Sequence, residues 1–285
     1  MQEHPYFDLR LHSDDALAEQ IGEPLAERVT LHEWPLSCVQ CIIGCSGHKW
    51  IYKAESGPTV EHRFYAQASS PLLPTVDTLY DRDGYVCLLI EYIDADHFDP
   101  TGLSDQNIVQ IGKSLVRSIA QIEGDLPAYW VVDSAQWRQT VSGMQHLFTT
   151  LVDDGVFLHV SRDAVDTVMQ ACKDATLVDC LTQDIGLVHG DLTADNVLVA
   201  TGDGAFLKLI DWQYVLRGPR LLDLSTFLDS LGIDPLPHVG LPIVKLMLLM
   251  RIHWLVECAA RWFVAGAPTY DRDIARMCAR LGELG

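Results

Sequence analysis

The chain has few basic residues for its length. Its 285 residues contain 20 lysines and arginines against 39 aspartates and glutamates, so the formal charge at pH 7 is −19. Such a surplus of negative charge repels nucleic acid and favours cationic ligands. We therefore expect no nucleic-acid partner. An acidic composition can also reflect solubility alone, so the charge by itself does not identify the substrate.

The sequence also lacks a long apolar run free of charges. Residues 1–15 have neither the basic start nor the apolar stretch of a secretory signal. The best membrane candidate, residues 239–266, contains Lys245, Arg251 and Glu257, and charges are costly in a bilayer core. We expect a cytoplasmic protein with no membrane partner, in which residues 239–266 form a buried amphipathic helix.

The eight cysteines lack the spacing of a disulfide framework or a zinc ribbon. Without a secretory signal, reduced thiols are expected. The spacing of Cys38, Cys41, Cys45 and His48 suggests zinc or an iron–sulfur cluster, but residues 37–43 are β-branched and apolar like a strand. Side chains three positions apart on a strand point to opposite faces, so Cys38 and Cys41 should diverge. We therefore predict no metal site in this segment.

The first third of the chain has the pattern of a sheet with helices. We predict a helix over residues 14–21 and three strands of an antiparallel meander over residues 28–34, 37–43 and 49–54. Glycines in residues 44–47 supply a turn, because glycine accepts positive φ without steric cost. Pro58 suits the first helical turn, so we expect a helix from there to about residue 68. The apolar run 85–92 predicts a central strand, and residues 94–100 break the pattern.

Beyond that break the chain becomes mostly helical. Apolar residues recur at helical spacing behind Ser104, a predicted N-cap. Further helices are predicted near residues 134–151, 162–181, 219–231, 241–264 and 271–281. Short strands and turns are expected over residues 186–209. The pattern predicts an α+β fold of two lobes, with antiparallel sheet plus helix in residues 1–93 and a mostly helical lobe in residues 94–285.

The most informative segment is a polar loop between apolar runs. Residues 187–199 read Leu-Val-His-Gly-Asp-Leu-Thr-Ala-Asp-Asn-Val-Leu-Val, and residues 207–212 read Leu-Lys-Leu-Ile-Asp-Trp. Strands on both sides would hold the loop's polar residues in place, and a further strand would deliver Asp211 nearby. Phosphoryl transfer depends on positioning and charge neutralisation more than on covalent help. One base and two magnesium-ligating groups suffice for it.

The pattern His-Gly-Asp, four residues, Asn and then Ile-Asp-Trp resembles the phosphotransferases of the aminoglycoside kinase and choline kinase group, which have a protein-kinase-like fold. By that resemblance, Asp191 is the catalytic base that accepts the proton of the acceptor hydroxyl. Asn196 and Asp211 would ligand Mg²⁺ on the phosphates of ATP or GTP. His189 would brace the loop, and Asp223 would be a second structural aspartate. A single Asp or Asn in a loop is usually a turn former, but their joint spacing favours the kinase interpretation.

The resemblance also implies a strand lysine paired with a helix glutamate. Alternation places Lys53 on the same strand face as Ile51, where an ammonium needs an anion, and nucleotide phosphates would supply one. Glu61, in the predicted helix, would be the glutamate partner. The plainer alternatives are an edge-strand charge for Lys53 and a carboxylate favoured at a helix N-terminus for Glu61.

Two further nucleotide contacts are expected. The phosphate-covering loop falls at residues 34–38, which contain no glycine and so depart from the protein-kinase pattern. We expect Ser37 and nearby backbone amides to hold the phosphates there. At the lobe boundary, backbone groups of Glu91 and Ile93 are expected to bind the adenine, the alternative being an ordinary strand end.

The acceptor is expected to be a small molecule with a hydroxyl group. The connector between Asp211 and Asp223 leaves no room for the activation segment and peptide-docking platform of a protein kinase, and it contains no Ala-Pro-Glu. Trp254 and Glu257 would hold a cationic acceptor by ring and carboxylate. The alternative is that Trp254 belongs to the core and Glu257 is a helix surface charge.

The sequence is compatible with three functions. The preferred one is magnesium-dependent transfer of the nucleotide γ-phosphate to an aminoglycoside, another antibiotic or another small alcohol, with antibiotic resistance as one use. A second is a metabolic kinase for choline, homoserine, a sugar or a fructosamine. A third is a nucleotide-binding pseudokinase that regulates a partner. The intact Lys53, Asp191, Asn196 and Asp211 argue against the third, because a binding module needs no base.

Overall fold

The structure is a computed structural model that describes residues 1–200 and 206–284. These residues form two compact units. The first unit consists of Met1–Asp99, Gln121–Tyr129 and the described residues of Ala194–Val215. The second consists of Pro100–Ala120, Trp130–Thr193 and the described residues from Leu216 onward. The predicted N-terminal lobe, residues 1–93, lies entirely in the first unit, and the lobe boundary after Ile93 stays a prediction.

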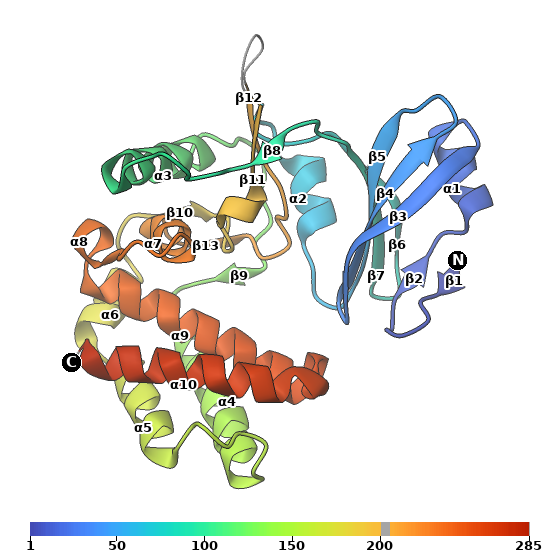
Figure 1. Cartoon of the computed structure of the whole chain (residues 1–285). Helices are drawn as coiled ribbons and strands as arrows, with labels where there is room; N and C mark the ends of the chain where they lie inside the picture. The colour runs from blue at the N-terminus through green and yellow to red at the C-terminus, as the bar shows by residue number, and fades with distance from the viewer. Residues whose placement is uncertain (201–205, 285) are drawn as a thin grey trace. The chain divides into compact units, whose positions relative to one another are not determined.

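The first unit is built on a five-stranded antiparallel sheet (Figure 1). In spatial order its strands are β3 (Leu25–Trp34), β4 (Ser37–Gly44), β5 (Lys49–Ser56), β7 (Tyr85–Glu91) and β6 (Val76–Arg82). The predicted meander of β3, β4 and β5 is confirmed. Strand β6 was not predicted. It is an edge strand with polar residues along much of its length, so it lacks the apolar run of a central strand. Two short strands, β1 (Gln2–Glu3) and β2 (Arg10–Leu11), pair beside the sheet.

Different helices cover the two faces of this sheet. The predicted helix α1 (Asp14–Ile21) is confirmed, and its Leu17 packs in a buried cluster with Tyr52 of β5. Lys53 is the next residue along β5, so its side chain points to the opposite face. That face carries the helix α2 (Glu61–Gln67), whose first residue contacts Lys53. Figure 1 shows α1 and α2 on opposite sides of the sheet.

Helix α2 begins later than the sequence predicts. It starts at Glu61, and Pro58 lies in the loop before it, so the prediction of a helix opening at Pro58 is wrong. The hydroxyl Oγ1 of Thr59 accepts a hydrogen bond from the backbone N–H of Glu61 at 3.2 Å. Threonine hydroxyls start turns in this way. The turn at Thr59, rather than the proline, therefore sets the start of the helix at Glu61.

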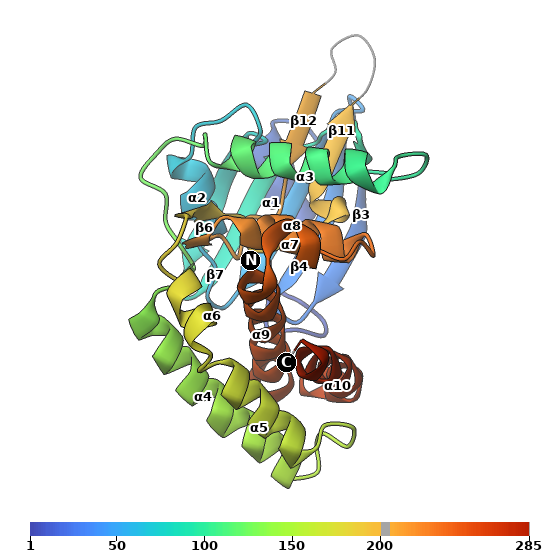
Figure 2. The ribbon, with the colours of Figure 1, turned by 90° about the vertical axis from the view of Figure 1, so that its left-hand side faces the viewer.

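A hairpin carries the second half of the diagnostic motif. Strands β11 (Val197–Ala200) and β12 (Phe206–Leu209) pair antiparallel, and β8 (Asp96–His97) pairs with the other edge of β11. Figure 2 shows β11 and β12 side by side. A short helical turn, η1 (Ala194–Asn196), leads into β11. Because Val197 lies opposite Leu209, the residues just before β11 and just after β12 lie at the same end of the hairpin.

The second unit contains one small sheet and most of the helices. Strand β13 (Leu216–Pro219) lies between β10 (Ile185–Val188) and β9 (Trp130–Val131). The helices are α3 (Asp105–Ile119), α4 (Ser134–Asp153), α5 (Arg162–Ala171), α6 (Ala175–Cys180), α7 (Leu221–Ser230), α8 (Leu236–Val239), α9 (Leu241–Glu257) and α10 (Ala267–Glu283). The predicted N-cap is confirmed, since Ser104 Oγ accepts from the N–H of Asn107.

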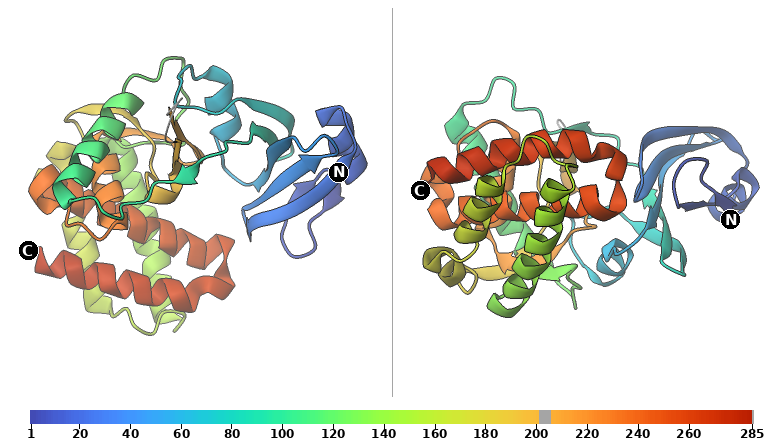
Figure 3. Two further views of the ribbon diagram at one scale, coloured as in Figure 1. Left: turned by 45° about the horizontal axis from the view of Figure 1, so that its top comes forward. Right: turned by 90° about the horizontal axis from the view of Figure 1, so that it is seen from below.

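Two predicted helices have different bounds in the structure. Residues 162–181 form two helices, because Asp174 interrupts the first and accepts from the N–H of Thr176 as the N-cap of α6. The helix predicted over residues 241–264 ends at Glu257 and continues as a wider turn, η2 (Cys258–Trp262), and a tighter one, η3 (Val264–Gly266). Figure 3 shows α9 and α10 side by side.

Helix α9 is buried on all sides along much of its length. Residues 243–249 are all buried, so the predicted amphipathic character is wrong. Its charges are tolerated because they are paired. Lys245 Nζ lies 3.0 Å from Asp174 Oδ2, and Arg251 contacts the carboxylate of Asp229. Among the described helices, none combines the length and apolar character that crossing a bilayer requires.

A buried carboxylate on α10 organises the loop between α4 and α5. Asp271 is 1% exposed and accepts hydrogen bonds from the backbone N–H groups of Leu158, His159 and Val160. His159 Nδ1 lies 2.7 Å from Asp271 Oδ2. Burial by itself would raise the pKa of Asp271, but these hydrogen bonds from His159 and the backbone lower it. The ionised carboxylate is therefore the form that holds the loop.

Replacing Asp271 should destabilise the protein. We expect Asp271→Ala to lower the free energy of unfolding by about 3 kcal/mol, because three backbone N–H groups lose their acceptor. Urea denaturation measures this loss. The matched control is Asp273→Ala on the same helix, whose side chain is 36% exposed and pairs with Arg276. That variant should change stability by less than about 0.5 kcal/mol.

The effect of Asp271 should also depend on pH. A lowered folded-state pKa contributes stability that is present above the unfolded pKa of about 3.9 and is lost as the pH falls through the folded pKa. The unfolding free energies of wild type and Asp271→Ala should therefore converge in acid. Equal stabilities of the two proteins at neutral pH would contradict the proposed loop anchor.

Candidate active site

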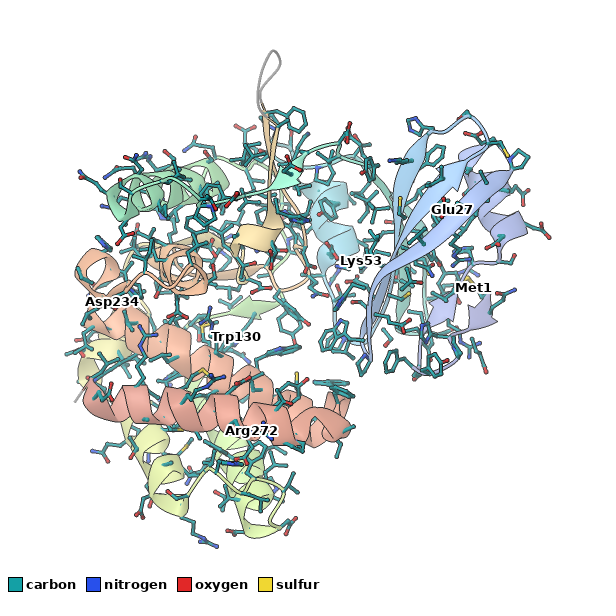
Figure 4. All side chains as sticks on the ribbon, in the orientation of Figure 1. Met1, Glu27, Lys53, Trp130, Asp234 and Arg272 are labelled. Atoms are coloured by element: carbon teal, nitrogen blue, oxygen red, sulfur yellow. The ribbon has the colours of Figure 1, made fainter. Side chains whose placement is uncertain are left out.

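Three carboxylates surround the ammonium of Lys53 in the first unit. Lys53 is 5% exposed, and its Nζ lies 2.5 Å from Glu61 Oε2 and 2.7 Å from Asp211 Oδ1. A third oxygen, Oε1 of Glu55, lies 3.2 Å from the same nitrogen. Figure 4 labels Lys53 on its strand of the sheet. Lys53 and Asp211, which are 158 positions apart in sequence, are thus in direct contact.

The backbone holds Asp211 in this position from both sides. The N–H of Ile210 donates to the carbonyl oxygen of Asn196 at 3.1 Å, and the N–H of Trp212 donates to Glu61 Oε1 at 3.0 Å. The Trp212 ring stacks on Phe64 of α2 with ring centroids 4.4 Å apart. Asp211 itself has φ of +66°, a left-handed conformation that residues other than glycine seldom adopt. Such backbone strain is characteristic of functional sites.

The electrostatics of the cluster favour the charged form of Lys53. Burial would lower its pKa, but the carboxylates of Asp211, Glu55 and Glu61 hold the pKa of Lys53 well above its ordinary value. Burial raises the pKa of Glu61, against the opposing effect of Lys53. One ammonium and three carboxylates give a formal charge of −2, and the charge is still negative when Glu61 carries a proton. The cluster therefore attracts a further cation.

Asn196 and Asp211 have the donor atoms that magnesium prefers. Magnesium binds carboxylate and carbonyl oxygens and keeps part of its water shell. The Asp211 side chain is 32% exposed, so its carboxylate is accessible from solvent, and Asn196 is 8% exposed. The backbone hydrogen bond between Ile210 and Asn196 places the two residues at the same end of the hairpin. Donor type, placement and the excess negative charge all fit a divalent cation.

The loop that carries Asp191 belongs to the second unit and is held by Asp223. The N–H groups of His189 and Gly190 donate to Asp223 Oδ2 and Oδ1 at 2.8 and 3.1 Å. The N–H of Asp191 donates to His189 Nδ1 at 3.3 Å. Gly190 has φ of +88°, which explains why glycine stands between the histidine and the aspartate. Asp191 is half-buried, while His189 and Asp223 are buried.

Burial dominates the ionisation of Asp223. The carboxyl is 1% exposed, and desolvation raises its pKa to about 7, although the N–H groups of His189 and Gly190 pull the pKa down. The charge of Asp191 adds to the rise. The group that braces the loop thus changes its charge near neutral pH.

This raised pKa predicts a pH-dependent stability. A group whose folded pKa is raised contributes stability that is present below the unfolded pKa and is lost as the pH rises through the folded value of about 7. Between about pH 4 and pH 7 the unfolding free energy of wild type should therefore fall relative to that of Asp223→Asn, which cannot ionise. Denaturant unfolding at several pH values measures both slopes. A control, Asp163→Asn on the exposed side of α5, should keep the wild-type slope, and an equal slope in Asp223→Asn would refute the assignment.

The other predicted nucleotide contacts already have partners within the protein. Ser37 is 3% exposed, and its Oγ accepts from the indole N–H of Trp34 at 2.7 Å. The backbone N–H of Glu91 donates to Thr75 at 2.8 Å, and the carbonyl of Ile93 accepts from Ala95 at 3.0 Å. Their roles in nucleotide binding stay predictions.

The two predicted acceptor residues lie on α9 in the second unit. Trp254 is half-buried. Glu257 pairs with Arg261 at 3.1 Å, its side chain is 16% exposed, and burial raises its pKa. Arg261 thus already balances the charge of Glu257. Acceptor binding by either residue stays a prediction.

Glu55 and Thr59 were not predicted as members of the cluster. Glu55 is 1% exposed, and its Oε2 accepts from Thr59 Oγ1 at 3.1 Å. The signal for Glu55 was available in the sequence, because it lies two positions after Lys53 and period-two alternation places both on one strand face. The sequence contained no such signal for Thr59, because its contact with Glu55 depends on how the loop before α2 folds.

One other group of potential metal ligands occurs among the residues described. The ligand atoms of His4, Glu33 and Cys38 lie within 4.8 Å of one another. The N–H groups of Tyr6 and Phe7 both donate to His4 Nδ1, so the ring proton lies on Nε2 and faces Glu33. Burial also raises the pKa of the Cys38 thiol to about 11. A metal ion would have to displace both of these protons, so the contact that the structure supports here is the one between His4 and Glu33 at 3.2 Å.

The divergence predicted for Cys38 and Cys41 is confirmed. In the register of β4 with β5, Cys38 lies opposite Ala54 and Cys41 lies opposite Ile51. Ala54 and Ile51 are three positions apart, so they point to opposite faces of the sheet.

The chain matches the model of a known protein family. Residues 59–246 match the model of the phosphotransferase enzyme family. The matched span contains Glu61, Asp191, Asn196, Asp211 and Asp223, whereas Lys53 precedes it. No curated protein sequence matches the chain.

Solved structures of small-molecule kinases are similar over nearly the whole chain. Spectinomycin phosphotransferase APH(9)-Ia, in complex with ADP and spectinomycin, is 14% identical, with a TM-score of 0.55 over 96% of this chain and 99% of that one. Amicoumacin kinase hAmiN, in complex with AMP-PNP, Ca²⁺ and Ami, is 14% identical, with a TM-score of 0.57 over 95% of this chain and 94% of that one. Choline kinase LicA from Streptococcus pneumoniae is 15% identical, with a TM-score of 0.59 over 93% and 98%. The predicted α+β, kinase-like fold is thereby confirmed.

Proposed function

Because this chain belongs to the phosphotransferase enzyme family and is a small-molecule kinase, we propose that it transfers the γ-phosphate of ATP or GTP to a hydroxyl of a cationic small molecule. The contact of Lys53 with both Glu61 and Asp211 carries the proposal. A buried ammonium bracketed by a helix glutamate and a metal-binding aspartate is the arrangement that kinases use to position nucleotide phosphates.

The proposed roles follow from the chemistry of each group. Asp191 accepts the proton of the acceptor hydroxyl, and Asp223 and His189 hold the loop that carries it. Lys53 donates to the nucleotide phosphates. Asn196 and Asp211 would hold magnesium. The metal, when bound, supplies neutralisation of the phosphate charge.

The acceptor class is supported by charge. The chain's formal charge of −19 favours a cationic acceptor over an anionic one. Amino-sugar antibiotics and choline are both cationic alcohols, and the similar solved proteins include a spectinomycin phosphotransferase, an amicoumacin kinase and a choline kinase. We therefore propose an aminoglycoside-like antibiotic as the first candidate and choline or a related metabolic alcohol as the second. An antibiotic acceptor would make the protein a resistance enzyme.

A nucleotide-consumption screen tests the proposal. The purified protein with magnesium and ATP or GTP is offered aminoglycosides, other hydroxylated antibiotics, choline and sugars, and mass spectrometry measures the transfer of one phosphate to the acceptor. We expect a cationic alcohol to accelerate nucleotide consumption above hydrolysis. Nucleotide binding with no phosphorylated product from any acceptor would instead favour the pseudokinase.

Asp191→Asn should separate chemistry from binding. We expect turnover to fall by about a hundredfold or more, the usual scale for a general base, while calorimetry finds unchanged affinity for the magnesium nucleotide. Asp211→Ala is the contrasting variant, in which magnesium-dependent nucleotide affinity itself should weaken. Wild-type turnover in Asp191→Asn would rule out Asp191 as the catalytic base. Unaltered affinity for the magnesium nucleotide in Asp211→Ala would rule out Asp211 as a metal ligand.

A further inference from the structure

Glu55 adds a negative charge that the proposed reaction does not require. Positioning the phosphates needs one ammonium, one helix carboxylate and one metal-binding aspartate, which Lys53, Glu61 and Asp211 supply. Glu55 is a third carboxylate on the same ammonium, 3.2 Å from Nζ, and it is 1% exposed. A buried charge is costly unless it is paired, and Glu55 shares its ion-pair partner, Lys53, with two other carboxylates.

The placement of Glu55 puts its charge where phosphates are expected. In the register of β4 with β5, Glu55 lies directly opposite Ser37, and Lys53 lies opposite Val39. Residues opposite each other in an antiparallel pair share a face of the sheet. Glu55 therefore lies beside both the proposed phosphate-binding lysine and the serine expected to contact phosphate, at the end of β4 that follows the turn after Trp34.

Of the three carboxylates around Lys53, Glu55 is the one that accepts no hydrogen bond from the ammonium. A lysine ammonium has three N–H donors. Lys53 donates to Glu61 and Asp211, whereas among the described residues no donor makes a hydrogen bond to Glu55 Oε1, which only pairs with the ammonium by charge. An incoming phosphate oxygen would thus compete with Glu55 for the third position around Nζ.

We propose that Glu55 determines donor selectivity: its carboxylate opposes a bare polyphosphate and so makes nucleotide binding depend on a divalent cation. The inference rests on the proposed function of Lys53 and Asp211. Like charges at close range in a buried site repel strongly. A cation held by Asn196 and Asp211 offsets that repulsion, so the nucleotide binds as its metal complex. Glu55 acts by its charge on the phosphates and is a selectivity residue, not a catalytic one.

Glu55→Gln tests this charge effect, because glutamine keeps the shape and an oxygen that accepts from Thr59. Calorimetry measures ADP affinity in the presence of magnesium and in the presence of a chelator. We expect metal-free ADP to bind about tenfold more tightly to Glu55→Gln than to wild type, and magnesium ADP to change by less than about threefold. An unchanged or weaker affinity for metal-free ADP would overturn the proposal, as would a loss confined to magnesium ADP, which would mark Glu55 as a metal ligand.

Two control variants separate the local charge from other effects. Asp77→Asn removes one negative charge from the exposed edge strand β6 of the same unit, and it should leave metal-free ADP affinity at the wild-type level. Thr59→Val removes the hydrogen bond to Glu55 and the one from the N–H of Glu61 but keeps the charge of Glu55, so it should not reproduce the gain. A gain of equal size in either control would overturn the proposal.

Wild type alone supplies a second measurement should Glu55→Gln fail to fold. Its affinity for ADP is expected to be at least about a hundredfold higher with magnesium than with chelator. A ratio near one would overturn the selectivity role of Glu55. If wild type binds no ADP even with magnesium, the proposed function itself fails, which is a different outcome.

Discussion

A buried ammonium that must be neutralised is the constraint on which the first unit depends. Lys53 lies on the central strand β5, and its two hydrogen-bonded carboxylates come from the start of α2 and from the residues that follow β12. Burying a charge is tolerated only when opposite charges reach it with good geometry. The strand, the helix and the hairpin are therefore fixed to one another by a single side chain, and the strained φ of Asp211 is held by the same contacts.

The second unit contains two buried carboxylates, and each of them orders a loop. Asp223 accepts from the backbone of the His189 loop, and Asp271 accepts from the backbone before α5. Yet their ionisation differs. Asp223 has a raised pKa because burial dominates, whereas Asp271 has a lowered pKa because four hydrogen bonds outweigh burial. The carboxylate that braces the His189 loop thus changes its charge around neutrality, whereas Asp271 is ionised at neutral pH.

Local signals predicted most of the fold, and the misses have physical causes. Helix α1 and the strands of the meander follow from apolar periodicity and turn residues, which act over a few positions. Strand β6 was missed because its polar residues hide the pattern of a central strand, and its contacts with β7 and α2 come from other segments. Pro58 was compatible with a helix start, but the hydroxyl of Thr59 placed the start at Glu61. The helix predicted over residues 162–181 divides because Asp174 caps α6 and pairs with Lys245 of α9, a contact from a distant segment.

The sequence alone supplied the residues of the candidate site, because the pattern of Asp191, Asn196 and Asp211 resembles that of the aminoglycoside kinase and choline kinase group. It also determined the strand face of Lys53, through the two-residue period of a β-strand. Only the tertiary structure decided how many anions meet that lysine, and that Trp34 and Thr75 are the partners of Ser37 and Glu91. The physical reason is that periodicity fixes the direction of a side chain, whereas distances between segments far apart in the chain depend on how the whole unit packs.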